Sequence, residues 1–247
     1  MKTILLLLFA LAALPTVGQE YSFTYHTDYP RLLARTQARA DALFYPKQLK
    51  RFVQNDTSLT DYEVLALLVG FTADKNYHPY PDLAVERNLY RLNDQGKYRE
   101  AASKGRSFNK THPLNQATLI ELSFAYHQLH KPDSAAYFVL QFHRVMDAMA
   151  LSGSGLHPDS ALFSLAPGDG QNFILKYLRA EIGSINSATD AHGNQLETME
   201  YVSEEDGARL PLYFNIQHAA RHLKKQLRES NEKAEATEQY PAKSRTL

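Results

Sequence analysis

One segment in the middle of the chain repeats after 34 residues. The stretch Gly-Lys-Tyr-Arg-Glu-Ala at residues 96–101 aligns with His-Lys-Pro-Asp-Ser-Ala at residues 130–135. A period of this length is typical of a helix–turn–helix unit that stacks on its neighbours. The recurring alanine has a physical role, because a small residue lets two helices approach closely. We therefore expect two stacked helical hairpins over about residues 82–115 and 116–149.

The apolar residues of the second unit support the same interpretation. Leu119, Leu122, Tyr126 and Ala135 fall on the apolar, apolar, aromatic and small positions of the tetratricopeptide (TPR) repeat. The match is degenerate, since Asn88 in the first unit stands where a leucine is usual. Two ordinary hairpins at a chance offset are the alternative. A further helix must cover one end of the pair, because each unit buries its apolar face on a neighbour.

A candidate for that covering helix lies upstream of the repeats. Thr60 and Glu63 have the spacing of a capping box, in which each side chain satisfies a free backbone N–H of the other. The apolar run at residues 64–69 follows directly, so we expect a helix that is mostly buried. Nearer the N-terminus, the Tyr-Pro pair at residues 29–30 predicts an extended step before a helix over residues 31–44.

The character of the chain changes after residue 150, where short apolar runs alternate with glycine and proline. The pattern predicts a short antiparallel sheet with helices, packed on the helical part. Residues 229–247 have almost no apolar content and are expected to be disordered. The expected strands cover residues 161–166, 195–202 and 210–216, and the expected helices cover residues 172–179 and 217–228.

These patterns predict a mainly α fold with a smaller α+β C-terminal part. Residues 19–150 form the helical, TPR-like part, and residues 151–228 form the α+β part.

Residues 1–18 have the pattern of a cleavable signal peptide. Lys2 supplies a positive start, residues 4–14 form an unbroken apolar run, and small residues precede Gln19. The run is too short to span a bilayer as a helix, which requires about 20 residues. We therefore expect an exported bacterial protein, periplasmic or extracellular. A buried N-terminal helix and an uncleaved anchor are the alternatives.

Composition excludes several classes of function. The chain has no cysteine, so disulfides cannot stabilise it outside the cytoplasm and a packed core must do so. Its 27 basic residues balance its 27 acidic ones, whereas a nucleic-acid binder usually carries a basic surplus. No apolar stretch of membrane length follows the leader. We expect no nucleic-acid partner, no cofactor and no membrane span after cleavage.

Three short segments also resemble a known family. They are Leu-Thr at residues 59–60, Ser-Gly-Ser-Gly at 152–155 with Asp-Ser-Ala at 159–161, and Leu-Tyr-Phe-Asn-Ile at 212–216. Together they resemble the bacterial domain of unknown function 4919, a family common in Bacteroidota that often carries a leader. The chain departs from that pattern at Leu68-Val69, where two tyrosines are frequent, and at Ser154, where an acidic residue is frequent. The resemblance implies the fold and the compartment, and it implies no established activity.

Two histidines have the spacing of a metal site. His218 and His222 lie four residues apart and would share one helix face, which is a spacing that can bind zinc. Ala219 stands where a metalloprotease would carry glutamate, and no third ligand is evident. The favoured hypothesis is therefore a pair of solvated surface histidines.

A second candidate site lies on the repeats, where Glu121, His127 and His143 could line a concave surface that receives a peptide or protein. Polar residues on the outer face of repeat helices are the alternative explanation. Since no catalytic spacing is present, a non-enzymatic interaction module is the favoured function.

A third candidate is the glycine-rich loop, with Ser152, Gly153, Gly155 and Asp159. Backbone N–H groups in such a loop could hold an anion, and a flexible hinge between the two parts is the simpler interpretation. The alternative function is a hydrolase or metal-dependent enzyme with its site near residues 152–159, between the two parts.

Overall fold

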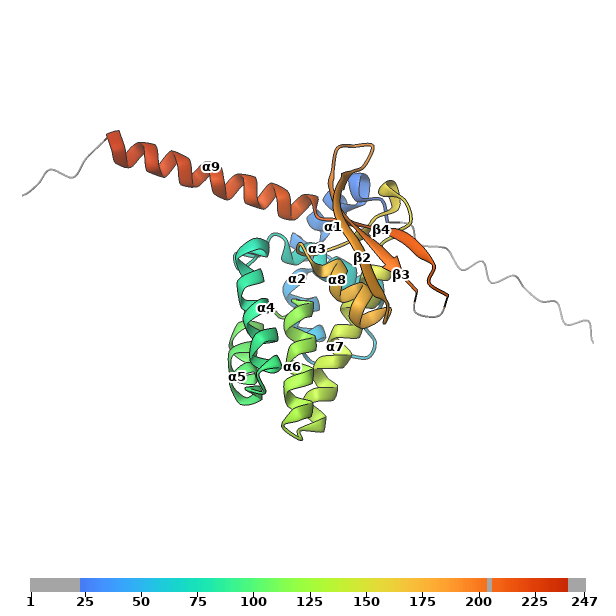
Figure 1. The fold of residues 1–247 in the computed structure, drawn as a ribbon. Helices are drawn as coiled ribbons and strands as arrows, with labels where there is room; N and C mark the ends of the chain where they lie inside the picture. The colour runs from blue at the N-terminus through green and yellow to red at the C-terminus, as the bar shows by residue number, and fades with distance from the viewer. Residues whose placement is uncertain (1–22, 204–205, 240–247) are drawn as a thin grey trace, which may run out of the picture.

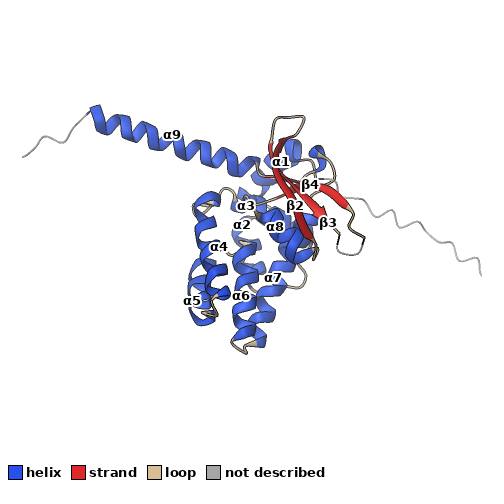
Figure 2. Ribbon diagram, viewed as in Figure 1, coloured by secondary structure: helices blue, strands red, loops and turns tan. Residues whose placement is uncertain are grey.

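The computed structural model describes residues 23–203 and 206–239. Helices form one side of the molecule and a small sheet lies at the other, so the two kinds of element are segregated (Figure 2). The signal-peptide prediction lies outside the described residues. Along the chain the elements are α1 (Tyr25–Gln37), α2 (Tyr45–Val53), α3 (Asp61–Phe71), α4 (Pro79–Asp94), α5 (Tyr98–Asn109), α6 (Gln116–Gln128), α7 (Pro132–Leu151), η1 (Pro158–Ser160), β1 (Leu162–Phe163), α8 (Asp169–Asn172), the π-helix η2 (Phe173–Tyr177), β2 (Glu181–Thr189), β3 (Gln195–Val202), β4 (Arg209–Asn215) and α9 (Gln217–Gln239).

Helical hairpins lie where the repeat predicted them. The first pairs α4 with α5, and the second pairs α6 with α7 (Figure 1). Gly105 lets α5 approach α6, because a Cβ on this residue would lie 2.7 Å from a methyl carbon of Leu122. The mainly helical class is therefore confirmed, and the relation of these hairpins to the tetratricopeptide repeat stays a prediction.

The same turn closes three helices of this part. After α2, α4 and α6 one residue adopts a left-handed conformation, with φ of 53° at Asn55, 69° at Gly96 and 55° at His130. In each case the next residue donates its backbone N–H to a carbonyl five residues earlier, which is the bond of a Schellman cap. The donor and acceptor pairs are Asp56 to Arg51 at 3.0 Å, Lys97 to Leu92 at 2.8 Å and Lys131 to Tyr126 at 2.9 Å.

The third of these turns allows a prediction about stability. His130 carries a Cβ in a conformation that costs an L-residue about 1–2 kcal/mol, whereas glycine adopts it freely. We expect His130→Gly to raise the free energy of unfolding by about 1 kcal/mol, as measured by urea denaturation. Gly96→Ala, at the equivalent position, should lower it by a similar amount. Equal stability of the three proteins would contradict this explanation of the turn.

Helix α3 forms the buried centre of the helical part. Every residue from Val64 to Phe71 is at most 2% exposed or is a buried glycine, so the predicted buried helix is confirmed. The predicted capping box is present too, because Thr60 Oγ1 accepts from Glu63 N at 3.2 Å and Glu63 Oε2 accepts from Thr60 N at 2.9 Å. Arg51 on α2 then binds the other carboxylate oxygen at 2.6 Å and joins the two helices.

The sheet corrects the prediction of a purely antiparallel arrangement. Its order is β1-β4-β3-β2, and β1 pairs with β4 in parallel, while the other pairs are antiparallel. The sheet is therefore mixed. Strand β3 lies where expected, β4 begins one residue earlier than expected and ends one earlier, and β1 is shorter than the apolar run. Strand β2 was not expected, because most of its residues are exposed and polar.

The C-terminal segment also differs from the prediction. Helix α9 continues to Gln239, so residues 229–239 are helical rather than disordered, and the helix projects away from the rest of the chain (Figure 1). The helix expected over residues 172–179 is instead the short α8 followed by the π-helix η2. Within the part of the chain that the structure describes, no helix combines the length and apolar character needed to cross a membrane.

Candidate functional site

An open groove runs along α6 and is the strongest candidate site. Helix α6 forms its floor, helices α4 and α5 form one wall, and α7 with η2 forms the other. Its volume is about 840 Å³. We call it the hairpin groove, lined by Tyr90, Asn93, Asp94, Tyr98, Ile120, Glu121, Ser123, Phe124, His127, Pro132, Ala135, Ala136, Val139 and Lys176.

Large aromatic side chains line the hairpin groove and remain in contact with water. Tyr90 is 59% exposed and Phe124 is 44% exposed, although both are large enough to bury much apolar surface. Phe124 meets the ring of Tyr98 edge-on at 6.0 Å, which holds the two aromatic rings across the groove from neighbouring helices. Exposed aromatic groups that gather in a concave surface are typical of a binding site.

One carboxylate is held at the floor of the groove. The amide nitrogen of Asn93 donates to Glu121 at both the carboxylate, at 2.7 Å, and the backbone oxygen, at 2.9 Å. Burial raises the pKa of Glu121, whereas the bond from Asn93 and the positive charge of Lys176 lower it. The groove therefore offers an oriented acceptor at its floor and an exposed cation at its rim.

The structure brings together two of the three residues proposed for a concave surface. Glu121 and His127 both line the hairpin groove. His143 lies elsewhere on α7, next to Phe142 and 6.0 Å from the ring of Tyr177. Tyr90 and Lys176 also line the groove, and no local sequence pattern predicts this, because they reach it only through the packing of distant segments.

The glycine-rich loop is held at both ends by hydrogen bonds and close backbone contacts. Ser152 is fully buried, and its hydroxyl donates to the carbonyl of Met149 at 2.6 Å while accepting from Phe163 N at 2.7 Å. A Cβ at Gly153 would clash with the backbone oxygen of Ser160. Gly155, with a φ of 70°, accepts a backbone bond from β4. The loop therefore joins the end of α7 to the sheet.

The enzyme hypothesis at this loop gains no support from its side chains. His157 Nδ1 lies 3.7 Å from a carboxylate oxygen of Asp159, and both side chains are more than half exposed. The hydroxyl of Ser154 pairs with that of Ser160 at 2.8 Å. Among the hydrogen bonds that the loop serines Ser152, Ser154 and Ser160 form within the described part of the chain, none joins a hydroxyl to an imidazole.

The prediction of two solvated surface histidines is wrong for His218. This residue is only 4% exposed, and its ring stacks on Phe163 at 4.5 Å, next to Tyr25 and Tyr29. Burial lowers the pKa of His218 to about 3. His222 is partly buried and contacts Tyr77 edge-on at 5.4 Å. Among the described residues, no three His, Asp or Glu side chains are arranged to hold a metal ion.

A group of carboxyls with raised pKa values lies between α4, α8 and β3. We call it the carboxyl cluster: Asp82, Glu86, Asp169 and Glu197. Burial is the main cause for each of them, and it raises the pKa of Asp169 to about 8 and that of Asp82 to about 6. The charges of Glu86 and Glu197 raise the pKa of Asp169 further.

Hydrogen bonds hold the carboxyl cluster in place. Asp169 accepts from Ala166 N at 2.8 Å, Glu197 accepts from Gly168 N at 2.9 Å, and Glu86 accepts from Asn115 at 2.6 Å. Raised pKa values can mark a site of acid–base chemistry. The hairpin groove includes none of these four carboxyls. Since folding raises their pKa values, the carboxyl cluster makes stability depend on pH.

Fold and groove together define a mainly helical α+β protein whose helical part carries an open, aromatic-lined groove. The chain matches the family described as domain of unknown function (DUF4919) over residues 27–226, and it belongs to that family. A comparison with curated proteins found no match, and a comparison with solved structures found none.

Proposed function

We propose that this protein is an exported, non-enzymatic interaction module that binds a peptide segment of a partner protein in the hairpin groove. The observation that carries the proposal is the gathering of Tyr90, Tyr98 and Phe124 around one open concave surface. Export follows from the leader pattern at residues 1–18.

The shape of the groove favours a peptide over a small molecule. It is open and lined from α4, α5, α6, α7 and η2, whereas small-molecule sites usually enclose most of the ligand. Apolar side chains of a peptide would pack on Ile120, Phe124 and Val139. A backbone N–H or a basic side chain of the peptide would meet Glu121, and an acidic side chain would meet Lys176.

Two single substitutions, one inside the groove and one outside it, test this proposal. Peptides selected from a random library on the wild-type protein should bind Phe124→Asp about tenfold or more weakly, because a charge would replace the central apolar contact. Leu140→Asp is the matched control, since Leu140 is 41% exposed on α7 and does not line the groove. Dissociation constants from isothermal titration calorimetry give the comparison.

Two outcomes would contradict the proposal. One is selection of no binding peptide by the wild-type protein. The other is an equal loss of affinity in the Phe124 and Leu140 variants, since that would place the binding surface outside the groove. Circular dichroism should show that both variants are folded, because both substituted side chains are partly exposed.

A further inference from the structure

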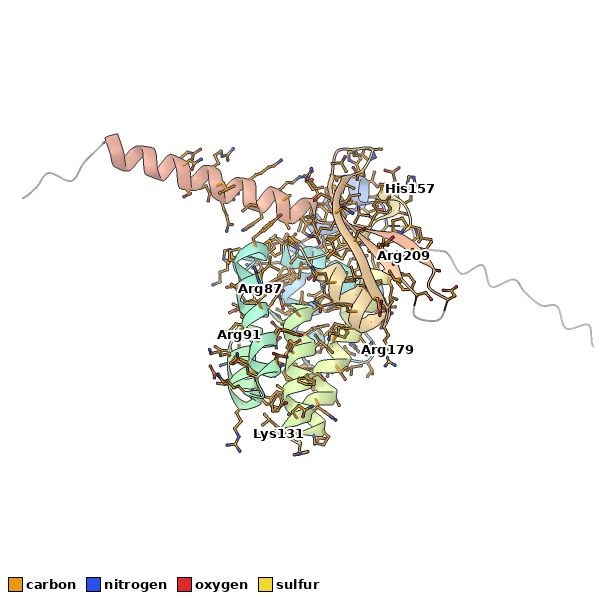
Figure 3. The ribbon with its side chains drawn as sticks, in the orientation of Figure 1. Arg87, Arg91, Lys131, His157, Arg179 and Arg209 are labelled. Carbon is orange, nitrogen blue, oxygen red and sulfur yellow. The ribbon has the colours of Figure 1, made fainter. Side chains whose placement is uncertain are left out.

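A second trough lies on the opposite side of α6 from the hairpin groove. Residues advance by about 100° each along a helix, so Tyr126 and Leu129 point away from the face that carries Ile120 and Phe124. Tyr126 and Leu129 line a trough of about 660 Å³ between α5 and the turn that precedes α7. Figure 3 shows Lys131 in this turn, at the end of the helical layer that lies farthest from the sheet.

Basic side chains surround this trough. Arg99, Arg106 and Lys110 project from one side of α5 and its C-terminal end, and Lys131 faces them from the start of α7. All four are exposed, and none forms an ion pair with another described residue. No carboxylate lines the trough, although the whole chain has equal numbers of acidic and basic residues.

The one acidic side chain on α5 is already engaged elsewhere. Glu100 pairs with Lys104 at 2.9 Å, and neither residue lines the trough. Ala102 and the hydroxyls of Ser103 and Ser107 form the small-residue floor between the long cations. Unpaired cations that converge over a shallow floor create a positive potential that an anionic ligand would neutralise.

The trough continues into a second section with apolar lining, and this section favours a ligand that has apolar groups as well as negative charge. A neighbouring hollow of about 570 Å³ shares Arg106, Lys110 and Tyr126 with it, so the two form one surface. The second section is lined by apolar side chains that include Leu49, Val53 and Phe138, and Val53 is 43% exposed. Asp133 supplies the one carboxylate in its lining, next to Ser134, so the acidic side chains of the peptide are expected on the first section. An inorganic anion would use only the first section, whereas a peptide with carboxylates next to apolar side chains would use both.

We infer that this surface, which we call the basic trough, binds an acidic peptide segment in which carboxylates stand beside apolar side chains. The carboxylates bind Arg99, Arg106, Lys110 and Lys131, and the apolar side chains pack against the section near Val53. The site is separate from the hairpin groove, so it gives the helical layer a second binding face with its own charge preference.

A charge-reversal experiment on the full chain tests the inference. The probe is a fluorescent peptide that alternates Glu and Asp with Leu and Phe, titrated at low ionic strength. The double variant Arg106→Glu with Lys110→Glu should weaken its binding about tenfold or more, because attraction becomes repulsion. The matched control, Arg39→Glu with Lys47→Glu, makes the same change of charge at exposed positions outside the trough and should bind like the wild type.

Competitors separate this ligand from other anions. A peptide of Glu and Asp without apolar residues, inorganic phosphate, and phosphatidylcholine vesicles containing phosphatidylserine should each compete poorly. Equal weakening in the two double variants would overturn the inference, and so would displacement of the probe by phosphate or vesicles. The hairpin-groove peptides should bind the Arg106 and Lys110 variant normally, so failure of this inference is distinguishable from failure of the proposed function.

Discussion

We expect Asp169→Asn to remove much of the decline in the free energy of unfolding that occurs as the pH rises to about 8. The carboxyl of Asp169 is 4% exposed, and its pKa is raised from 3.8 to about 8, chiefly by burial. The folded state therefore holds its proton across a range in which the unfolded chain releases it. The stability contributed by this group is complete below about pH 4 and is lost as the pH rises through about 8.

The magnitude of this effect follows from proton linkage. One pH unit within that range changes the contribution by at most about 1.4 kcal/mol. Asparagine cannot ionise, and its oxygen can still accept from Ala166 N. We compare the free energy of unfolding of Asp169→Asn with that of the wild type by urea denaturation. The value for the variant minus the value for the wild type should be at least about 2 kcal/mol larger at pH 8 than at pH 5.

A matched substitution controls for a general effect of removing charge. Asp159 is an exposed carboxylate, and Asp159→Asn should leave the pH dependence of the wild type unchanged. If Asp169→Asn also kept the wild-type pH dependence, the buried carboxyl would not be the group that titrates. Asp169 would then have no part in the loss of stability at higher pH.

We expect His218→Phe to remove a decrease in the free energy of unfolding that occurs as the pH falls below about 6.5. The pKa of His218 falls from 6.5 to about 3, because burial against Phe163 and its neighbours disfavours the charged ring. The unfolded chain therefore takes up the proton first. The stability contributed by the neutral ring is complete above about pH 6.5 and is lost as the pH falls toward about 3, by at most about 1.4 kcal/mol per pH unit.

Asp169 and His218 oppose each other between about pH 4 and about pH 6.5, so their two contributions to the free energy of unfolding cancel there. In His218→Phe the contribution of Asp169 is no longer opposed by that of the imidazole. The free energy of unfolding should then fall as the pH rises from about 4. Phenylalanine can keep the stacking on Phe163. His157→Phe, at a ring that is 70% exposed, is the control and should keep the wild-type pH dependence. A wild-type pH dependence retained in His218→Phe would contradict the assignment.

Local signals in the sequence predicted the elements that depend on local bonds. The capping box at Thr60 located α3, and alternation located β3, because both patterns reflect contacts between near neighbours. Strand β2 carries little pattern of its own, since it is defined by pairing with β3. The extended step expected at residues 29–30 is wrong, because both residues lie within α1, where Tyr29 packs against His218.

The candidate site was predictable only in part, for the same physical reason. Glu121 and His127 lie on the same helix, α6, and both reach the groove, so one element brings them together. Lys176 and Tyr90 reach the groove from other segments, and only the tertiary packing brings them there. The burial of His218 was missed because helical spacing identifies a face of α9 and does not reveal what covers it.

The most direct test of groove binding is a map of the residues that a selected peptide contacts. In amide and methyl NMR spectra, titration of the peptide should shift the signals of Ile120, Phe124 and Val139, which line the hairpin groove. Signals of Ser154 and Asp159 in the packed loop should stay in place. Shifts confined to that loop, or spread evenly over the surface, would contradict the account.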